Sequence, residues 1–522
     1  MSGAATGAPA GPPPGAPPPI PFTARVAAGL LGVFIGAMMS GLNNRVGALA
    51  LVDIRGAHGF SMDGASWLGT AYSAGELIAM PFATWFAITL SLKRFHQMML
   101  TGVVVLAAII PFADSLPLLI GLRAVQGVAG GALIPVLMMA ALRFLPAPIR
   151  LHGFALYAMT ATFAPNLAIW LTAQWTDQLI DWRLVYWQVI PLGLLALALV
   201  GWGMPASPPV FARFKTGNWY GMAFGVVGLA LLAVAADQGD RLDWMHSRLI
   251  VWALASGLAA CAVYLLSEWY HPAPFIKLSL LSRRNLALGF IIFILLLVTL
   301  LSGSSLPAGY LGAVQGYRAM QSAPIGLLIG LPQLVIGPLV ALLLYQKWVD
   351  ARVTLSLGLA CIAYACLLGS QLTDGWIWQD FLWPQLLECL GQPLAIISML
   401  YLATGVVQPM EGPYLSGAIN MLRALGTLLG SSLISEFITK RGDFHSEMLL
   451  DSAARAGGSP AIAVDPGQLA GVVHIQGFIL ATADAYRVLG ILAALLIPLA
   501  LLMQFIPAPV LPAPAKPSAS HG

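Results

Sequence analysis

The sequence predicts an all-α polytopic membrane protein with fourteen transmembrane helices. Of its 522 residues, 59% are hydrophobic and only 9% are charged, whereas a soluble domain carries about 25% charged residues. Apolar runs of roughly twenty residues, the length needed to cross about 30 Å of hydrocarbon, recur along the whole chain. Helices are expected for these runs because a helix satisfies its own backbone hydrogen bonds in lipid.

The fourteen runs follow one another with short polar connections. In chain order they are expected at 26–52, 65–90, 97–113, 116–142, 151–173, 185–204, 218–236, 247–267, 286–306, 323–345, 353–371, 381–404, 414–438 and 484–506. An even number of spans places both termini on one side of the membrane. Nearly every short loop on that side carries a Lys or Arg residue, so the positive-inside rule predicts that both termini are cytoplasmic.

The two ends of the chain are rich in proline and alanine, and residues 1–22 and 507–522 are expected to be disordered tails. Residues 1–21 have no basic segment, so no cleavable signal peptide is expected. Two further segments interrupt the regular rhythm of spans. Residues 271–285 mix apolar and basic side chains and predict an interfacial segment on the cytoplasmic leaflet. Residues 440–482 form a long outside loop, which could be a linker, a hairpin or a docking surface.

A cation lies inside the fourth run. Arg123 is placed at or near hydrocarbon depth, with Gln126 one helical turn away on the same face. A guanidinium at this depth costs roughly 2.5 to 3.5 kcal/mol, so it should face a partner or a water-filled cavity. Gly127, Gly130 and Gly131 leave one flank of the helix bare for a close neighbour. Arg123 is therefore a candidate functional residue, and the alternative is an Arg that only fastens neighbouring helices.

Several motifs in order along the chain resemble the fourteen-span drug:proton antiporter family of the major facilitator superfamily, the EmrB/QacA type. They are Trp67-Leu-Gly-Thr-Ala-Tyr72 with Pro81, Arg123-Ala-Val-Gln-Gly127, Trp182-Arg183 with Pro191, Leu278 to Gly289, and Asn420-x-x-Arg423 with Gly426 and Gly430. The resemblance runs from about Val26 to Gln504. It implies the major facilitator fold of two six-helix bundles, here at 23–206 and 286–506, with two inserted helices at 207–270.

The resemblance also implies a function. It predicts a proton-coupled efflux transporter for small amphipathic drugs or organic anions in a bacterial inner membrane, with the substrate bound near the midplane between the bundles. Relatives of this type in Gram-negative bacteria work with a periplasmic adaptor and an outer-membrane channel, so these are expected partners beside the substrate, protons and lipid. The alternative is an anion uptake transporter or facilitator with altered proton coupling.

The chain departs from the family pattern in the first span. The family has Asp-x-Thr at the cavity, and this chain has Asn43-Asn44-Arg45. A buried Arg45 needs a counter-charge or an anionic ligand, and the candidates are Glu76, Glu388 or a substrate carboxylate. An Arg45–Glu76 ion pair that simply fastens two spans is the plain alternative.

Other candidate residues follow from their depth. Glu76 and Glu388 are the carboxylates placed deepest in apolar runs, and either could take up and release the transported proton. Asn420 and Arg423 are candidates in the thirteenth span, and Tyr72 and Trp170 are candidates for lining an aromatic cavity. The family's gating Asp after the second span is replaced by Ile88, so the inner gate is expected to be latched differently, through Asp350 and Lys93 or Arg94.

The composition argues against other function classes. The net charge of +4 gives no basic footprint for nucleic acid. The sequence has no Gly-x-x-x-x-Gly-Lys phosphate loop and no His-Glu-x-x-His zinc motif, and its four cysteines have no metal-binding spacing. No cofactor, no metal and no enzymatic activity are therefore expected.

Overall fold

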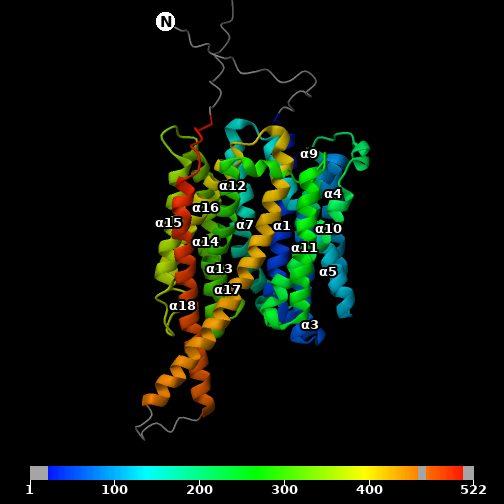
Figure 1. The fold of residues 1–522 in the computed structure, drawn as a ribbon. Helices are drawn as coiled ribbons and strands as arrows, with labels where there is room; N and C mark the ends of the chain where they lie inside the picture. The colour runs from blue at the N-terminus through cyan, green and yellow to red at the C-terminus, as the bar shows by residue number, and fades with distance from the viewer. Residues whose placement is uncertain (1–21, 457–465, 510–522) are drawn as a thin grey trace, which may run out of the picture.

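The computed structural model describes residues 22–456 and 466–509, and these form helices and short connections. Fourteen helical segments are long and apolar enough to cross a membrane, as the sequence predicts. Figure 1 shows them side by side, roughly parallel, with the start of α1 and the end of α18 at the same end of the molecule. Most of the predicted tails 1–22 and 507–522, namely residues 1–21 and 510–522, lie outside the described residues.

The first bundle contains six spans. Thr23 caps the first helix by accepting a hydrogen bond from the Val26 amide, and Ser61 caps the third helix in the same way. Proline interrupts the fourth span, because Pro135 has no N–H to bond the carbonyl of Gly131. The helices are α1 (Ala24–Leu49), α2 (Leu51–His58), α3 (Met62–Leu90), α4 (Leu92–Ile109), α5 (Leu116–Gly131), α6 (Leu133–Phe144), α7 (Arg150–Ala173), α8 (Leu184–Trp187) and α9 (Val189–Gly203).

The second bundle also contains six spans, of which the first is divided at Leu300 into two helices. Pro307, inside the second of these helices, removes the bond to Gly303 close to this division. The helices are α12 (Arg284–Thr299), α13 (Leu301–Val314), α14 (Ala319–Leu344), α15 (Ala351–Gly369), α16 (Leu382–Thr404), α17 (Gly412–Ala456) and α18 (Pro466–Leu501).

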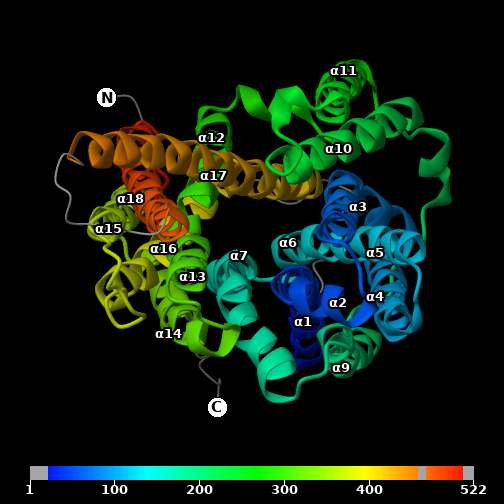
Figure 2. The ribbon, with the colours of Figure 1, turned by 90° about the horizontal axis from the view of Figure 1, so that it is seen from below.

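Two inserted helices, α10 (Trp219–Gly239) and α11 (Arg248–Tyr270), connect the bundles. They pack against each other, and α10 also packs against α3 of the first bundle and α17 of the second. Figure 2 shows α10 beside both of these helices, with α11 on its outer side. The inserted helix α10 therefore covers the junction between the bundles.

The expected outside loop 440–482 is mostly helical. α17 continues for 45 residues and α18 begins again at Pro466, so α17 alone is roughly 68 Å long at 1.5 Å per residue. Figure 1 shows the two helices projecting together beyond the bundle, at the end opposite to the start of α1. Arg441 and His445 of α17 hold Asp484 of α18 at 2.6 and 2.8 Å, where the two helices leave the bundle. The segment is a helical hairpin.

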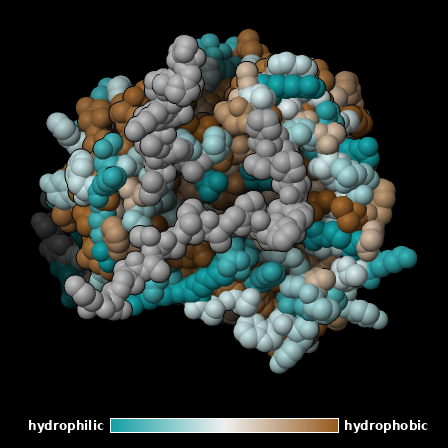
Figure 3. All heavy atoms as spheres, turned by 90° about the horizontal axis from the view of Figure 1, so that it is seen from above, coloured by the Kyte–Doolittle hydropathy of each residue, from teal (hydrophilic) through white to brown (hydrophobic). Residues whose placement is uncertain are grey.

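The opposite end of the molecule carries polar surface. Figure 3 views this end, where hydrophilic side chains gather over parts of the described surface. The segment 271–285 lies here and contains a short 3-10 helix, Leu278–Ser282. Arg283 donates hydrogen bonds from both terminal nitrogens to Glu411, at 2.7 and 2.9 Å, and binds the Val406 carbonyl. The segment is thereby fixed to the connection between α16 and α17.

Candidate functional site

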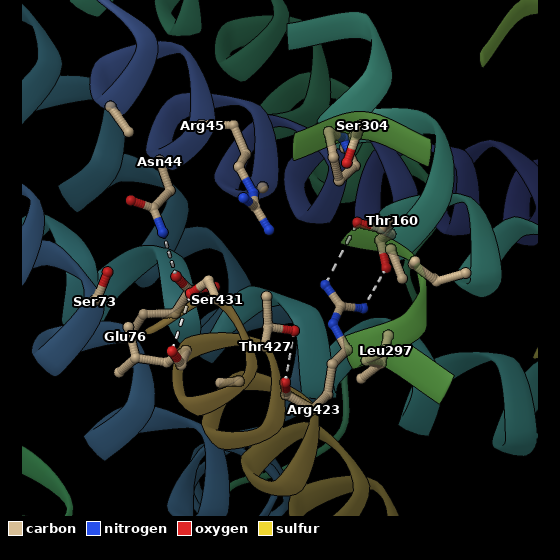
Figure 4. Close-up of a pocket in the computed structure, with 18 of the residues that line it drawn as sticks. Asn44, Arg45, Ser73, Glu76, Thr160, Leu297, Ser304, Arg423, Thr427 and Ser431 are labelled. Atoms are coloured by element: carbon tan, nitrogen blue, oxygen red, sulfur yellow. Dashed lines mark hydrogen bonds between the residues drawn. The ribbon is translucent and has the colours of Figure 1, made fainter. Parts of the chain in front are cut away.

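A cavity of about 240 Å³ lies between the two bundles. Its walls come from α1, α3 and α7 of the first bundle, from the inserted helix α10, and from α12, α13, α16 and α17 of the second. Polar groups converge on it from several of these helices, as Figure 4 shows. They include Asn44, Arg45, Ser73, Glu76, Thr160, Asn166, Asp237, Ser304, Gln392, Arg423, Thr427 and Ser431.

Glu76 reaches the cavity from the middle of α3. Its carboxylate accepts a hydrogen bond of 3.0 Å from the Asn44 side-chain amide on α1. Asn44 occupies part of the first-span motif in which the family has an acid, so the amide donates to a carboxylate supplied by another helix. The result is one carboxyl group facing the cavity, held in place by a neutral partner.

Arg45 lies next to Asn44 in the chain but points in a different direction. Successive residues on an α-helix are turned by about 100°. The Arg45 side chain therefore points into the cavity, whereas the Asn44 side chain points toward Glu76 (Figure 4). Among the described residues it has no ion pair within 4.0 Å and no hydrogen bond of its side chain. The expected Arg45–Glu76 ion pair is therefore absent from this conformation, and the Arg45 guanidinium is available to a ligand.

Arg423 is the second cation of the cavity, on α17. It is 8% exposed, and it donates hydrogen bonds of 2.6 and 3.5 Å to the hydroxyl and carbonyl oxygens of Thr160 on α7. Asn420, one turn earlier, accepts a hydrogen bond of 2.9 Å from Tyr157 of α7. Both predicted residues of this span thus join the two bundles, and Arg423 also faces the cavity.

Hydrogen bonds between α17 and the first bundle continue from Asn420 to the beginning of α17. Ser416 donates a hydrogen bond of 2.7 Å to the Pro135 carbonyl, and Thr84 donates one of 2.9 Å to the Pro413 carbonyl. Together with Asn420 these contacts recur every three or four residues, which is one face of a helix. On the side of the cavity nearer the start of α1, the two bundles are therefore hydrogen-bonded together along α17.

This contact corrects the expected latch. Asp350 does not reach Lys93 or Arg94: it caps α15 and pairs with Arg352 at 2.6 Å. Lys93 instead donates to the carbonyl of Gly201, and Arg94 is exposed. The inner side is held by neutral hydrogen bonds of α17 in place of charged pairs.

Arg123 lies inside the first bundle and does not line the central cavity. Its side chain is 2% exposed, donates a hydrogen bond of 2.8 Å to Gln126, and stacks on Tyr72 at 4.4 Å and on Tyr186 at 5.5 Å. These rings stabilise the buried cation through their π faces. Arg123 has no carboxylate within 4.0 Å among the described residues, and its Nε has no hydrogen-bond partner.

A second, smaller cavity of about 230 Å³ reaches Arg123 from the hairpin side. It shares three lining residues with the central cavity, namely Ala48, Gly69 and Asp237. The two cavities are therefore neighbours, and Arg123 borders the second one only.

The glycines near Arg123 allow the close approach of α3 and α5. A Cβ at Gly127 would lie 2.2 Å from the Tyr72 carbonyl oxygen, and one at Gly131 would lie 2.5 Å from the carbonyl oxygen of Glu76. Real Cβ atoms do not come this close, so both positions require glycine. This packing fixes where Tyr72 lies along the helix axis relative to Arg123, and where Glu76 lies relative to the cavity. It confirms the prediction that the glycine flank of this span packs closely against a neighbouring helix, which is α3.

Glu388 lies deep in the second bundle, 1% exposed. Its carboxylate accepts hydrogen bonds from Ser302 at 2.5 Å and from Gln392 at 3.1 Å. Gln392 also lines the central cavity and binds Gln333. Glu388 is thus connected to the cavity through one amide side chain, and it has no cation within 4.0 Å in the described part of the chain.

Three sequence candidates do not line the cavity. Tyr72 is buried between Arg123 and Ser40, to whose carbonyl oxygen it donates a hydrogen bond of 3.2 Å. Asn43 is buried in the first bundle, because it points to the side of α1 away from the cavity. Trp170 is half-buried on α7 outside the lining. The expectation of an aromatic cavity built from Tyr72 and Trp170 is wrong for this conformation.

Asp237 is a cavity residue that the sequence reasoning missed. It occupies the last turn of α10, is exposed, and lines both cavities. The predicted span 218–236 ends one residue earlier, so Asp237 lies just outside it. An acid that directly follows a span is the only signal that could have indicated it. Among the described residues no cluster of three or more metal-ligating side chains occurs.

Comparisons with known proteins agree with this architecture. The sequence profile of the Major Facilitator Superfamily matches residues 33–431. The fatty acid resistance protein FarB of Neisseria gonorrhoeae is 23% identical over 495 residues, 90% of this chain and 94% of that protein. The multidrug export protein EmrB of Escherichia coli is 24% identical over 80% of this chain and 81% of its own, and the colistin resistance protein EmrB of Acinetobacter baumannii is 22% identical over 79% and 80%.

Solved structures share the fold. The human organic anion transporter MFSD10 (TETRAN) aligns with a TM-score of 0.59 at 14% identity, over 92% of this chain and all of its own. A peptide transporter of the POT family bound to sulfate aligns with a TM-score of 0.56 at 14% identity, over 91% and 95% of the two chains. At this identity the likeness concerns the arrangement of helices alone.

Proposed function

The chain belongs to the major facilitator superfamily, and we propose that it is a proton-coupled exporter of small amphipathic drugs or organic anions. We place it in the inner membrane of a bacterium with both termini in the cytoplasm. The observation that carries the proposal is Arg45, a guanidinium without an ion pair in a cavity between the two bundles. A ligand carboxylate suits this group because guanidinium binds it bidentately.

The relatives support the same class of substrate. Their names describe resistance to a fatty acid and to colistin, and multidrug export. A fatty acid has one carboxylate and a long apolar part, and the cavity offers two arginines together with apolar walls such as Leu297 and Leu301. An amphipathic anion fits both kinds of wall.

The membrane potential favours this direction of transport. Moving one negative charge out of a cell that is negative inside gains about 2.3 kcal/mol per 100 mV. A proton that enters in exchange adds a second favourable charge movement. We propose Glu76 as the group that carries the proton, since it is the acid in the cavity that lies closest to both bundles' arginines, and Glu388, reached through Gln392, as the alternative.

The contacts along α17 support alternating access. They join the bundles on the side nearer the start of α1, while the cavity-lining residues of α17 run from Arg423 toward the hairpin. This is the arrangement expected when the inner side is closed. Export then requires the hydrogen bonds of Ser416 and Asn420 to break so that the cavity can open to the cytoplasm.

We also propose that the projecting hairpin of α17 and α18 contacts a periplasmic adaptor, which would join the transporter to an outer-membrane channel. The hairpin extends well beyond the helical bundle (Figure 1). It carries exposed apolar side chains at Phe444, Met448 and Val472, which a partner could cover.

The second candidate function is anion uptake or facilitated diffusion. Asn43 stands where the family has an acid, in the stretch Asn43-Asn44-Arg45, and this observation favours altered proton coupling. The two candidates differ at Glu76, because a facilitator should tolerate Glu76→Gln and a proton antiporter should not.

The test is accumulation of organic acids and amphipathic drugs in cells that express the protein, with and without an uncoupler. We expect the wild type to lower accumulation, the uncoupler to abolish this effect, and Arg45→Gln to remove it for anions. Arg94→Gln is the matched control, since Arg94 is exposed and lines neither the central nor the second cavity. Raised accumulation in the wild type would support uptake instead.

A further inference from the structure

We propose that the preferred substrate is zwitterionic, with its anionic group at Arg45 and its cationic group at Asp237. The inference rests on the proposed function, and it assigns to the inserted helix α10 a part in substrate selection. Arg45 and Asp237 are opposite charges that face one cavity without an ion-pair partner.

The Asp237 carboxylate is almost unengaged. It accepts one hydrogen bond, from the Thr70 hydroxyl, and forms no ion pair among the described residues. Its side chain is exposed, although α10 packs against α3 and α17. Its second carboxylate oxygen is therefore free to accept from a ligand.

The neighbouring cation is directed away from Asp237. Arg241 lies one turn further along the chain, and it donates to Gln238 at 2.6 Å and to Asp63 at 2.8 Å. Gln238 in turn binds the Thr70 hydroxyl that holds Asp237. This network fixes the Asp237 side chain, and it engages Arg241, which follows the end of α10, with partners other than Asp237.

The two charges come from different walls of the cavity. Arg45 lies on α1 and Asp237 on α10, and no side chain of the described chain bridges them. A ligand that carries one opposite charge for each pairs with both groups at once, whereas a simple anion leaves Asp237 unmatched.

Asp237 also stands where the central cavity meets the second one. A cationic group bound there lies toward the hairpin, and an anionic group at Arg45 lies closer to Glu76. The orientation of the ligand is therefore fixed, with its amine toward the outer side in this conformation.

The test compares ω-amino fatty acids with fatty acids of the same chain length, from four to twelve carbons, and with the matching alkylamines. Binding is measured by calorimetry on the purified full-length protein. We expect at least one ω-amino acid to bind about tenfold more tightly than its fatty acid. Asp237→Asn should reduce this ratio to about one and change the affinity for the fatty acid less than twofold.

Asp240→Asn is the matched control. Asp240 follows Asp237 by one turn, binds Ser435 at 2.6 Å, and does not line the central cavity, so the ratio should not change. Equal or weaker binding of every ω-amino acid in the wild type, or an unchanged ratio in Asp237→Asn, would overturn the inference. Uncoupler-sensitive export of other amphipathic compounds in cells would then still stand, so the two proposals fail separately.

Discussion

Asn44 of α1 donates a hydrogen bond of 3.0 Å to the Glu76 carboxylate of α3. This contact occupies the position where an arginine–carboxylate pair was expected, and it leaves Arg45 facing the cavity. Among the described residues, one acid and one cation thus lie in the same site without an ion pair within 4.0 Å between them, and we propose that a proton and an anionic ligand each use a separate group.

Arg45 and Arg123, both in the first bundle, should respond differently to substitution. Arg45→Gln should raise the apparent KM for anions tenfold or more with little change in thermal stability, since the Arg45 side chain makes no hydrogen bond or ion pair with any of the described residues. Arg123→Gln should lower the free energy of unfolding by roughly 2 kcal/mol. The substitution removes the guanidinium that stacks on the rings of Tyr72 and Tyr186, and it leaves buried polar groups unmatched. Thermal unfolding and transport kinetics of both variants distinguish the roles. Equal destabilisation by the two substitutions would contradict this assignment.

The hydrogen bonds of α17 should stabilise the conformation that is closed at the inner side. Replacing Ser416 and Asn420 by Ala removes contacts to Pro135 and Tyr157, and the protein should then populate the inward-open form more. Spin labels at Arg94 and Lys347, which are exposed on the two bundles, report the separation of the inner ends. The longer distance should gain population in the double variant, and Ser435→Ala, at the other end of the bundle, should not produce this gain.

The packing of α3 against α5 makes a sharp stability prediction. Gly127→Ala places a Cβ 2.2 Å from a backbone carbonyl, which should cost about 1–3 kcal/mol. Gly121→Ala is the control on the same helix, because nothing lies within 4 Å of its added Cβ. Unfolding in denaturing detergent should separate the two variants. A stable Gly127→Ala protein would show that α3 and α5 are further apart than described.

Acid should weaken the contact that holds segment 271–285. The Arg283 guanidinium lowers the pKa of Glu411 through its hydrogen bonds. Since the folded pKa is the lower one, the stabilisation is fully present above the ordinary Glu pKa of about 4.3 and is lost as the pH falls through the folded value. Below pH 5 the melting temperature of the wild type should therefore fall more steeply than that of Glu411→Gln. Glu447→Gln, at an exposed and unpaired residue of the hairpin, should follow the wild type.

The spans could be predicted from sequence because hydropathy is a local property that each apolar run carries by itself. The hairpin could not be predicted in this way, because a helix that extends beyond the bilayer no longer carries a continuous apolar run. Residues 440–456 of α17 are an example. Depth in an apolar run indicates Glu76 as a candidate, and the first-span and thirteenth-span motifs indicate Arg45 and Arg423. Which of them meet depends on small rotations of helices about their axes, and the sequence does not determine these.

Arg123 and Tyr72 illustrate the same limit. Both were expected to be functional on the basis of motif and depth, and the structure places them against each other inside the first bundle. Their contact depends on the position along α5 at which α3 packs against it, and Gly127 sets this position. Asp237 shows the opposite case, because its role follows from α10 packing between the bundles, a tertiary fact with no local pattern.

The most direct test of the account is proton movement in liposomes that contain the purified protein and an internal pH indicator. A pH gradient is imposed, and an amphipathic anion that cells exclude in the accumulation assay is added. We expect wild-type protein to move protons against the substrate and to build a substrate gradient, and Glu76→Gln to retain substrate exchange while losing both effects. Substrate movement that is unchanged by an uncoupler and by Glu76→Gln would contradict proton-coupled export.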